Sequence, residues 1–234
     1  MTSIQPLVPV DPEGLEDIAR KLLEASTPDE AKGSKLVVPA NASNENYVIV
    51  PNHGVIAVAQ SHNNLNYNST IAALSQEGLR MPPPSVFMPY FMHAKAAAEG
   101  KIAMHYANNK PVPRAKAEDI FKWLTTSHRS GIWTWLNAKF VAGSGFSNLD
   151  LQTARHATGN RVQSAKSRLE QCVWEDCFVD LEFNSQGFPT HKSAKQEYEA
   201  GRNIKFWYPR EGSVARFDAN SVWAYLYCDW DPQY

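Results

Sequence analysis

Four carboxylates lie close together in the stretch CVWEDCFVDLEF, at Glu175, Asp176, Asp180 and Glu182. Neighbouring carboxylates can act as a general acid and a general base when their environments push their pKa values apart. In the alternative interpretation the acids are solvated or hold turns, and apolar neighbours pack inward. These neighbours are Trp174, Cys177 or Phe178, and Val179. No nucleophile with a base beside it accompanies the acids, so we predict that the chain is not an enzyme.

The sequence contains three cysteines, at Cys172, Cys177 and Cys228. Cys172 and Cys177 have the C-x4-C spacing that two zinc ligands can adopt, but a structural zinc site takes four ligands. No H-x3–5-H pair supplies the other two, and an odd, low count argues against a disulfide scaffold. P-loop, dinucleotide-binding, nucleophile-elbow and zincin motifs are also missing. We therefore expect free or buried thiols, with no metal and no cofactor.

The closing stretch, SVARFDANSVWAYLYCDWDPQY at 213–234, divides by strand periodicity into two sets of residues. The parity changes after Val222 and Trp223, and a bulge or a short turn there would keep one face inward throughout. The inward set is small or apolar, as a packed core requires. It comprises Phe217, Ala219, Ser221, Ala224, Leu226 and Cys228.

The outward set combines rigid aromatic side chains with short polar ones, which is the composition of an antibody paratope. It comprises Asp218, Asn220, Val222, Trp223, Tyr225, Tyr227, Asp229, Trp230, Asp231, Gln233 and Tyr234. The periodicity alone is compatible with two interpretations, a binding face or an ordinary sheet edge with exposed aromatic residues.

Helices are expected before strands, which favours an α+β fold over alternating α/β units. Helical patterns occupy EGLEDIARKLLEAS, NYNSTIAALSQEGL, the segment from Pro84 or Ser85 to Gly100, and PRAKAEDIFKWLTTSH. Asn68 or Ser69 is expected to cap the second helix, and Gly78 to end it. Strands are expected at Leu36–Val38, Tyr47–Val50, Val55–Ala59, GIWTWLNAKFV, Val173–Leu181 and Ile204–Trp207. The remainder of 145–212 is expected to be loop-rich.

Composition limits the classes of partner. The chain has 234 residues, a formal net charge of -1 and no run of five basic residues, so nucleic-acid binding is not expected. Its longest apolar runs are too short to span a membrane. The segment MTSIQPLVPVDPEG lacks the basic and apolar regions of a signal peptide.

The closing stretch also fits a spaced pattern, V-A-R-F-x-A-x-S-x-x-A-x-L-x-C-x-x-x-P. The fixed positions are Val214, Ala215, Arg216, Phe217, Ala219, Ser221, Ala224, Leu226, Cys228 and Pro232. Upstream support comes from EGLRMPPPSVFM, GIWTWLNAKF, EQCVWEDCFVDL, NSQGFPTHKSAKQ and FWYP. Over about its last two thirds the chain resembles the variable proteins of diversity-generating retroelements. The resemblance is closest to viral and archaeal members, and the best-known relative is the phage tropism determinant.

This resemblance implies one C-type lectin-like domain over 1–234, with N-terminal helices, small antiparallel sheets and a loop-rich C-terminal half. Residues 1–35 would form an N-terminal helical segment and 213–234 the variable region. In such systems a reverse transcriptase miscopies adenines of a template RNA, and the copy replaces the end of the target gene. The x positions of the pattern would then vary. Family members continue past the proline with a loop and a closing strand, whereas the printed sequence ends at Tyr234.

The implied function is recognition of a protein or surface ligand by residues 218–234, displayed on a virion or a cell. Two alternatives use the same fold. An enzyme similar to a formylglycine-generating oxidase would need a pair of reactive cysteines, and Cys228 stands alone in the closing stretch. A calcium-dependent sugar lectin would need several oxygen ligands, of which Asp229 and Asp231 are the candidates.

Overall fold

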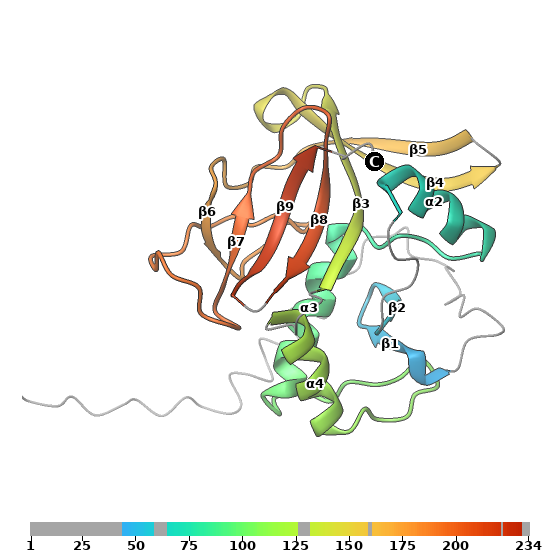
Figure 1. Ribbon diagram of the computed structural model, residues 1–234, viewed down its shortest axis with the longest axis vertical. Helices are drawn as coiled ribbons and strands as arrows, with labels where there is room; N and C mark the ends of the chain where they lie inside the picture. The colour runs from blue at the N-terminus through green and yellow to red at the C-terminus, as the bar shows by residue number, and fades with distance from the viewer. Residues whose placement is uncertain (1–43, 59–64, 126–131, 159–160, 221, 231–234) are drawn as a thin grey trace, which may run out of the picture. The chain divides into compact units, whose positions relative to one another are not determined.

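The computed structural model describes residues 44–58, 65–125, 132–158, 161–220 and 222–230 (Figure 1). Backbone contacts divide the chain into residues 1–37 and 38–234, and every described residue belongs to the second unit. The first predicted helix and the strand at Leu36–Val38 lie outside the described residues. No helix in the described part is long and apolar enough to cross a membrane.

Most strands belong to one seven-stranded sheet with the order β5-β4-β3-β8-β9-β7-β6. Its strands are β3 (Ile132–Ala142), β4 (Leu149–Thr158), β5 (Arg161–Arg168), β6 (Cys177–Asp180), β7 (Asn203–Trp207), β8 (Ser213–Ala219) and β9 (Ala224–Trp230). All neighbours are antiparallel except β7 and β9. A separate hairpin pairs β1 (Tyr47–Val50) with β2 (Gly54–Ala57). The α+β prediction is thus confirmed, but the main sheet is larger than predicted.

Three helices precede this sheet in the chain, as predicted: α2 (Tyr67–Gln76), α3 (Pro84–Ala98) and α4 (Arg114–Thr125). The predicted cap of α2 was wrong by two or three residues, because the side chain of Asn66 accepts the hydrogen bond from Ser69 N at 2.8 Å. The remaining elements are two short 3-10 helices, η1 (Asn44–Asn46) and η2 (Phe146–Asn148).

One face of the sheet packs against α3 and α4. The ring of Phe217 on β8 lies 4.8 Å from that of Phe87 and 5.7 Å from that of Phe91, measured between centroids. Phe91 in turn contacts Phe121 on α4, with 5.7 Å between ring centroids. The strand residues buried in this core include Leu136, Ala138, Phe140, Ile204, Phe206, Ala215, Phe217, Ala219, Ala224, Leu226 and Cys228.

The helix α2 covers part of the opposite face of the sheet. Tyr67 and Ile71 form a second apolar cluster with Met81, Trp135 and Val214. The Trp135 indole donates a hydrogen bond to the carbonyl of Leu65 at 3.0 Å, and so ties β3 to the start of the helix. Beyond this cluster the same face carries the outward residues of β8, β9 and β7.

The hairpin of β4 and β5 falls in the segment predicted to be loop-rich. Its sequence alternates small and polar residues with few apolar ones, so hydrophobic periodicity is weak there. The structure pairs the two strands along their whole length, from Asp150 opposite Arg168 to Thr158 opposite Arg161. The dipeptide Gly159–Asn160 between the strands is a hairpin signal that could have revealed them.

Candidate functional site

The strands β8 and β9 form the antiparallel hairpin that contains the predicted outward and inward sets. The register runs from Ser213 opposite Trp230 to Ala219 opposite Ala224. The connection is a short turn, one of the two predicted possibilities. The side-chain oxygen of Asn220 accepts hydrogen bonds from Val222 N at 2.8 Å and Trp223 N at 3.0 Å. This reversal restores the parity of the buried face after the turn.

Burial follows the predicted division of the hairpin. In the inward set Phe217, Ala219, Ala224 and Leu226 are fully buried and Cys228 is 2% exposed. The described outward residues of the two strands, Asp218, Tyr225 and Tyr227, are half-buried, as are Asn220 and Trp223 in the turn. Val222 is 59% exposed. The two sets therefore face different surroundings, one the helices and the other the open side of the sheet.

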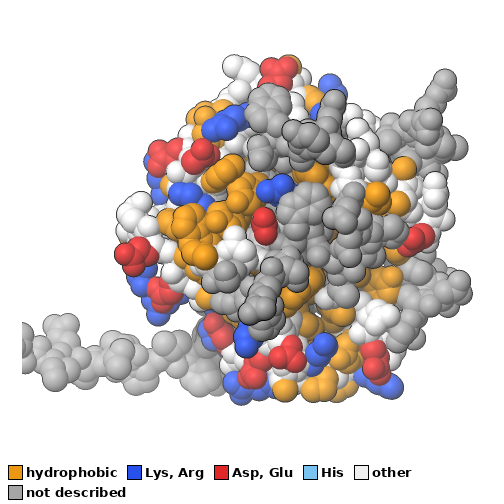
Figure 2. Space-filling view, in the orientation of Figure 1, with side chains coloured by type: hydrophobic (Ala, Val, Ile, Leu, Met, Phe, Trp, Pro, Cys, Tyr) orange, Lys and Arg blue, Asp and Glu red, His pale blue; other side chains and the backbone are white. Residues whose placement is uncertain are grey.

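The open side carries a continuous row of rings, which we call the aromatic face and define as Trp207, Trp223, Tyr225 and Tyr227. Tyr225 and Tyr227 are stacked, with centroids 4.7 Å apart and planes 15° apart. Trp223 lies 5.4 Å from Tyr225, and Trp207 lies edge-on to Tyr227 at 4.5 Å. In Figure 2 hydrophobic side chains gather left of centre over β7 and β9, with basic and acidic side chains at the border.

Charged residues flank the rings at fixed register positions. Tyr225 lies between Asp218 on β8 and Lys205 on β7, and Tyr227 lies between Arg216 on β8 and Trp207 on β7. The Arg216 guanidinium sits over the Tyr227 ring, 4.8 Å from its centroid, and its distance to the Asp218 carboxylate is 4.0 Å. The site thus offers ring surfaces together with a cation and an anion.

Two groups of the site have shifted pKa values. Burial raises the pKa of Asp218, although the positive charge of Arg216 opposes this shift. Burial, reinforced by nearby Tyr225 and Asp218, also raises the pKa of Tyr227 well above its ordinary value. The Tyr227 hydroxyl therefore keeps its proton throughout the neutral range, where it can donate a hydrogen bond.

The structure describes the last residues of the predicted outward set incompletely or not at all. Asp229 and Trp230 belong to β9, opposite Val214 and Ser213 respectively, but their side chains are outside the described structure. Asp231, Gln233 and Tyr234 lie wholly outside it.

Several residues of the site come from outside the closing stretch. Trp207 and Lys205 reach the face because β7 pairs with β9 in parallel, a long-range pairing that periodicity does not reveal. Phe178 on β6 extends the face, with its ring 5.9 Å from Trp223 and the Lys205 amine 4.8 Å above it. The sequence signals for this part of the site were the strand predicted at Ile204–Trp207 and the motifs FWYP, with Trp207, and EQCVWEDCFVDL, with Phe178; none of them indicates the pairing.

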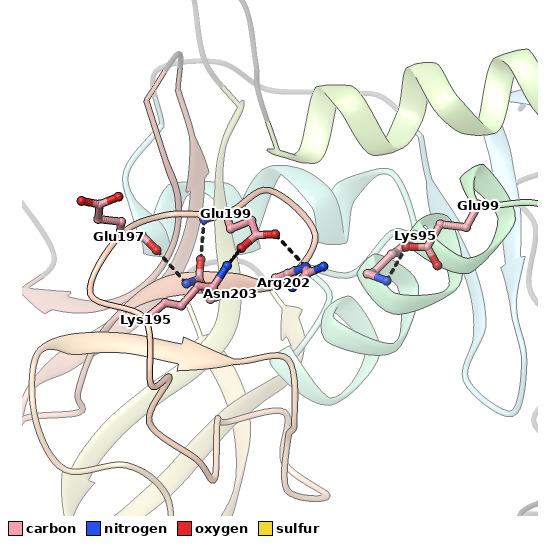
Figure 3. A network of polar contacts seen from close by, with 7 residues as sticks. All are labelled: Lys95, Glu99, Lys195, Glu197, Glu199, Arg202 and Asn203. Atoms are coloured by element: carbon pink, nitrogen blue, oxygen red, sulfur yellow. Dashed lines mark hydrogen bonds and ion pairs between the residues drawn. The ribbon is translucent and has the colours of Figure 1, made fainter. Parts of the chain in front are cut away.

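A buried asparagine fixes the entry into β7 (Figure 3). The Asn203 amide donates to Glu197 O at 2.9 Å, and its oxygen accepts from Glu199 N at 2.8 Å. The Glu199 carboxylate also pairs with Lys195 and, at 2.7 Å, with Arg202. This network holds the loop before β7 and so positions the strand that carries Trp207.

Three of the four clustered acids near β6 form contacts at the protein surface. Glu175 pairs with Lys192 at 2.6 Å and Glu182 with His191 at 2.9 Å. Asp176 accepts from Tyr208 N and pairs with Arg210, both at 3.2 Å. For these three acids the structure agrees with solvation and turn formation.

The predicted inward position of Trp174 was wrong. Its side chain is 38% exposed, because it precedes β6 and packs on Phe146 and Tyr208 instead of entering the core. The cysteines Cys172 and Cys228 are buried, and burial raises the pKa of Cys172 to about 12. In the described ranges no three His, Cys, Asp or Glu side chains gather into a possible metal site.

The chain was compared with family models, curated proteins and solved structures, and none of them matches it.

Proposed function

We propose that the chain is a ligand-binding protein whose aromatic face, with Arg216 and Asp218, contacts the ligand. The observation that carries this proposal is the division of one hairpin into a fully buried set and an aromatic set on opposite sides. Stacked, half-buried rings with few rotatable bonds offer contact area at a low entropic cost, and Trp, Tyr and Arg dominate binding energy in interfaces.

The position of the hairpin supports the proposal. Both strands are internal to the sheet, with β3 beside β8 and β7 beside β9. Backbone hydrogen bonds on both sides fix these strands whatever the outward side chains are. A ligand therefore meets side chains on a rigid support, which limits the entropy lost on binding.

The finer proposal is that this is a diversity-generating retroelement variable protein with a C-type lectin-like fold. Support comes from burial: among the described fixed positions all but the half-buried Arg216 are buried, namely Val214, Ala215, Phe217, Ala219, Ala224, Leu226 and Cys228. The varying positions whose side chains the structure describes are half-buried or exposed. Replacing them opens no cavity in the core, which is the condition for tolerating variation.

Sequencing the gene's surroundings tests the origin of the variation. We expect a near-copy of the codons for 214–234 beside a reverse-transcriptase gene, differing from the target gene only where the copy has adenine. Differences spread over all four bases would contradict the retroelement proposal but leave ligand binding open.

Selection from a random-peptide phage library tests ligand binding directly. The protein is used as bait beside a Trp223→Ala/Tyr225→Ala/Tyr227→Ala variant, and beside a Trp174→Ala variant that removes an exposed ring elsewhere. We expect enriched peptides to bind the wild type and the Trp174 variant, and to lose at least about tenfold in affinity for the triple variant. Equal binding to all three proteins would refute the proposed face.

A further inference from the structure

The strand β5 forms one end of the seven-stranded sheet and has a strand neighbour on one side only within the described structure. Figure 1 shows β4 and β5 running together to the right, away from β7 and β9. The side chains of Gln163, Ser164, Lys166, Ser167 and Arg168 are exposed. An edge strand of this kind presents backbone N–H and C=O groups that can pair with a further strand.

A side chain closes this edge at its C-terminal end. The Gln186 amide donates to Arg168 O at 2.7 Å and to Ser167 Oγ at 3.3 Å. Pairing with a further strand is therefore available along 163–166, where no such cap is present in the described structure.

The hairpin is more basic than the chain as a whole. Residues 149–168 contain four Lys and Arg and one Asp, whereas the whole chain has a formal net charge of -1. By register Lys139 on β3, Gln152 on β4 and Lys166 on β5 form one row across the sheet. The ion pairs formed among the described residues include neither Lys139, Lys166 nor Arg168.

This charge pattern decides which kind of strand can pair with β5. Lys166 and Arg168 are two residues apart, so they lie on the same face of the sheet. A second copy of β5 added in parallel and in register would place Lys166 opposite Lys166, which opposes that mode of self-association. A strand with carboxylates at alternate positions would place opposite charges there.

The open edge also favours a peptide over a nucleic acid as the partner. An edge strand exposes both N–H donors and C=O acceptors, and a peptide backbone satisfies both. Phosphate oxygens only accept hydrogen bonds, so a phosphodiester chain would leave the edge carbonyls without donors. The edge therefore favours a polypeptide among polyanions.

We propose that β5 binds an extended acidic segment of a partner protein by strand addition along 163–166, with carboxylates at alternate positions and one of them opposite Lys166. This surface is separate from the aromatic face and does not depend on the ligand of that face. It would give the protein a second binding surface, outside the positions that are predicted to vary.

Fluorescence anisotropy with a labelled eight-residue peptide of alternating Glu and Thr tests this proposal. The charge-reversing variant Lys166→Glu should weaken binding about tenfold, because it turns an attractive cross-strand pair into a repulsive one. The matched variant Lys116→Glu makes the same charge change at an exposed position on α4 and should bind like the wild type. Circular dichroism verifies that both variants are folded.

Two further probes separate strand addition from general attraction of anions. Two versions of the peptide carry N-methyl groups either on every Glu or on every Thr, which keeps the charge but blocks one set of N–H donors each. We expect one version to lose binding and the other to retain most of it. Equal binding of both versions, equal loss in the two variants, or tighter binding of a single-stranded oligonucleotide of eight nucleotides would overturn the proposal.

Discussion

Replacing Leu226 by alanine should destabilise the protein far more than replacing Tyr225, although the two residues are neighbours on β9. Leu226 is fully buried, and its register partners Phe206 and Phe217 belong to strands that are themselves held in the sheet. The cavity left by Leu226→Ala cannot collapse easily, so we expect a cost of about 3–4 kcal/mol.

The cost at Tyr225 has a different origin. Its ring is half-buried and stacked on Tyr227, so Tyr225→Ala loses an aromatic pair of about 0.5–1.5 kcal/mol and up to about 1 kcal/mol of strand propensity. We therefore expect about 1–2 kcal/mol in total. Tyr225→Phe keeps the stack and should cost less than about 0.5 kcal/mol.

Urea unfolding measured by tryptophan fluorescence gives the three free energies, with the slope of the transition showing whether the unfolded state has changed. Leu226→Ala should cost at least about 1 kcal/mol more than Tyr225→Ala. Equal costs would mean that the outward rings are part of the core. The aromatic face would then be structural, and the proposed function would lose its main support.

Three further predictions concern the turn, the half-buried carboxyl of Asp218 and a close backbone approach. Asn220→Ala removes the acceptor of two turn N–H groups and should lower the free energy of unfolding by about 1 kcal/mol. Asn220→Asp keeps an acceptor and should lower it less. Equal losses of the two variants in thermal unfolding would contradict this. Burial raises the pKa of Asp218, so its contribution to stability is greatest below the ordinary value of about 3.9 and falls as pH rises through the folded value. In urea unfolding at pH 3 to 7, the free energy of unfolding of Asp218→Asn should therefore rise relative to that of the wild type as pH increases across that window. A constant difference between the two proteins would refute the pKa shift. Gly187→Ala should lower the free energy of unfolding by more than about 2 kcal/mol, because φ is +85° and the added Cβ would lie 2.3 Å from the Pro84 backbone. The matched control is Gly78→Ala, at φ +73° in open space, which should lower it less.

The closing hairpin was predictable because its signal is local. Alternation of small residues with aromatic and polar ones predicts the two faces, and the change of parity at Val222 and Trp223 predicts either a bulge or a short turn. Asn220 adds a turn residue whose side chain bonds to the backbone two and three residues ahead. Each of these features depends on residues within a few positions of one another.

The rest of the site depends on contacts between distant segments. Trp207 and Tyr227 are twenty residues apart, and only the parallel pairing of β7 with β9 brings their rings to 4.5 Å. The hairpin of β4 and β5 escaped prediction for a different reason. Its residues are exposed over most of β5, so no apolar set marks one face, and strand formation there rests on the pairing of β5 with β4 and of β4 with β3.

An internal hairpin is well suited to carry variation because its backbone and its outward side chains contribute to different energies. The ladder joining β8 to β3 and β9 to β7 involves only backbone groups, and the inward set fills the space against α3. Changing an outward strand residue alters neither term, so its cost is limited to neighbouring ring contacts and strand propensity; Asn220, whose side chain holds the turn, is the exception. An edge strand such as β5 lacks this protection, because its side chains also decide which strands may pair with it. We therefore expect variation to cost least at the outward strand positions in the centre of this sheet, whereas the proposed strand addition at β5 would require a defined pattern of charge.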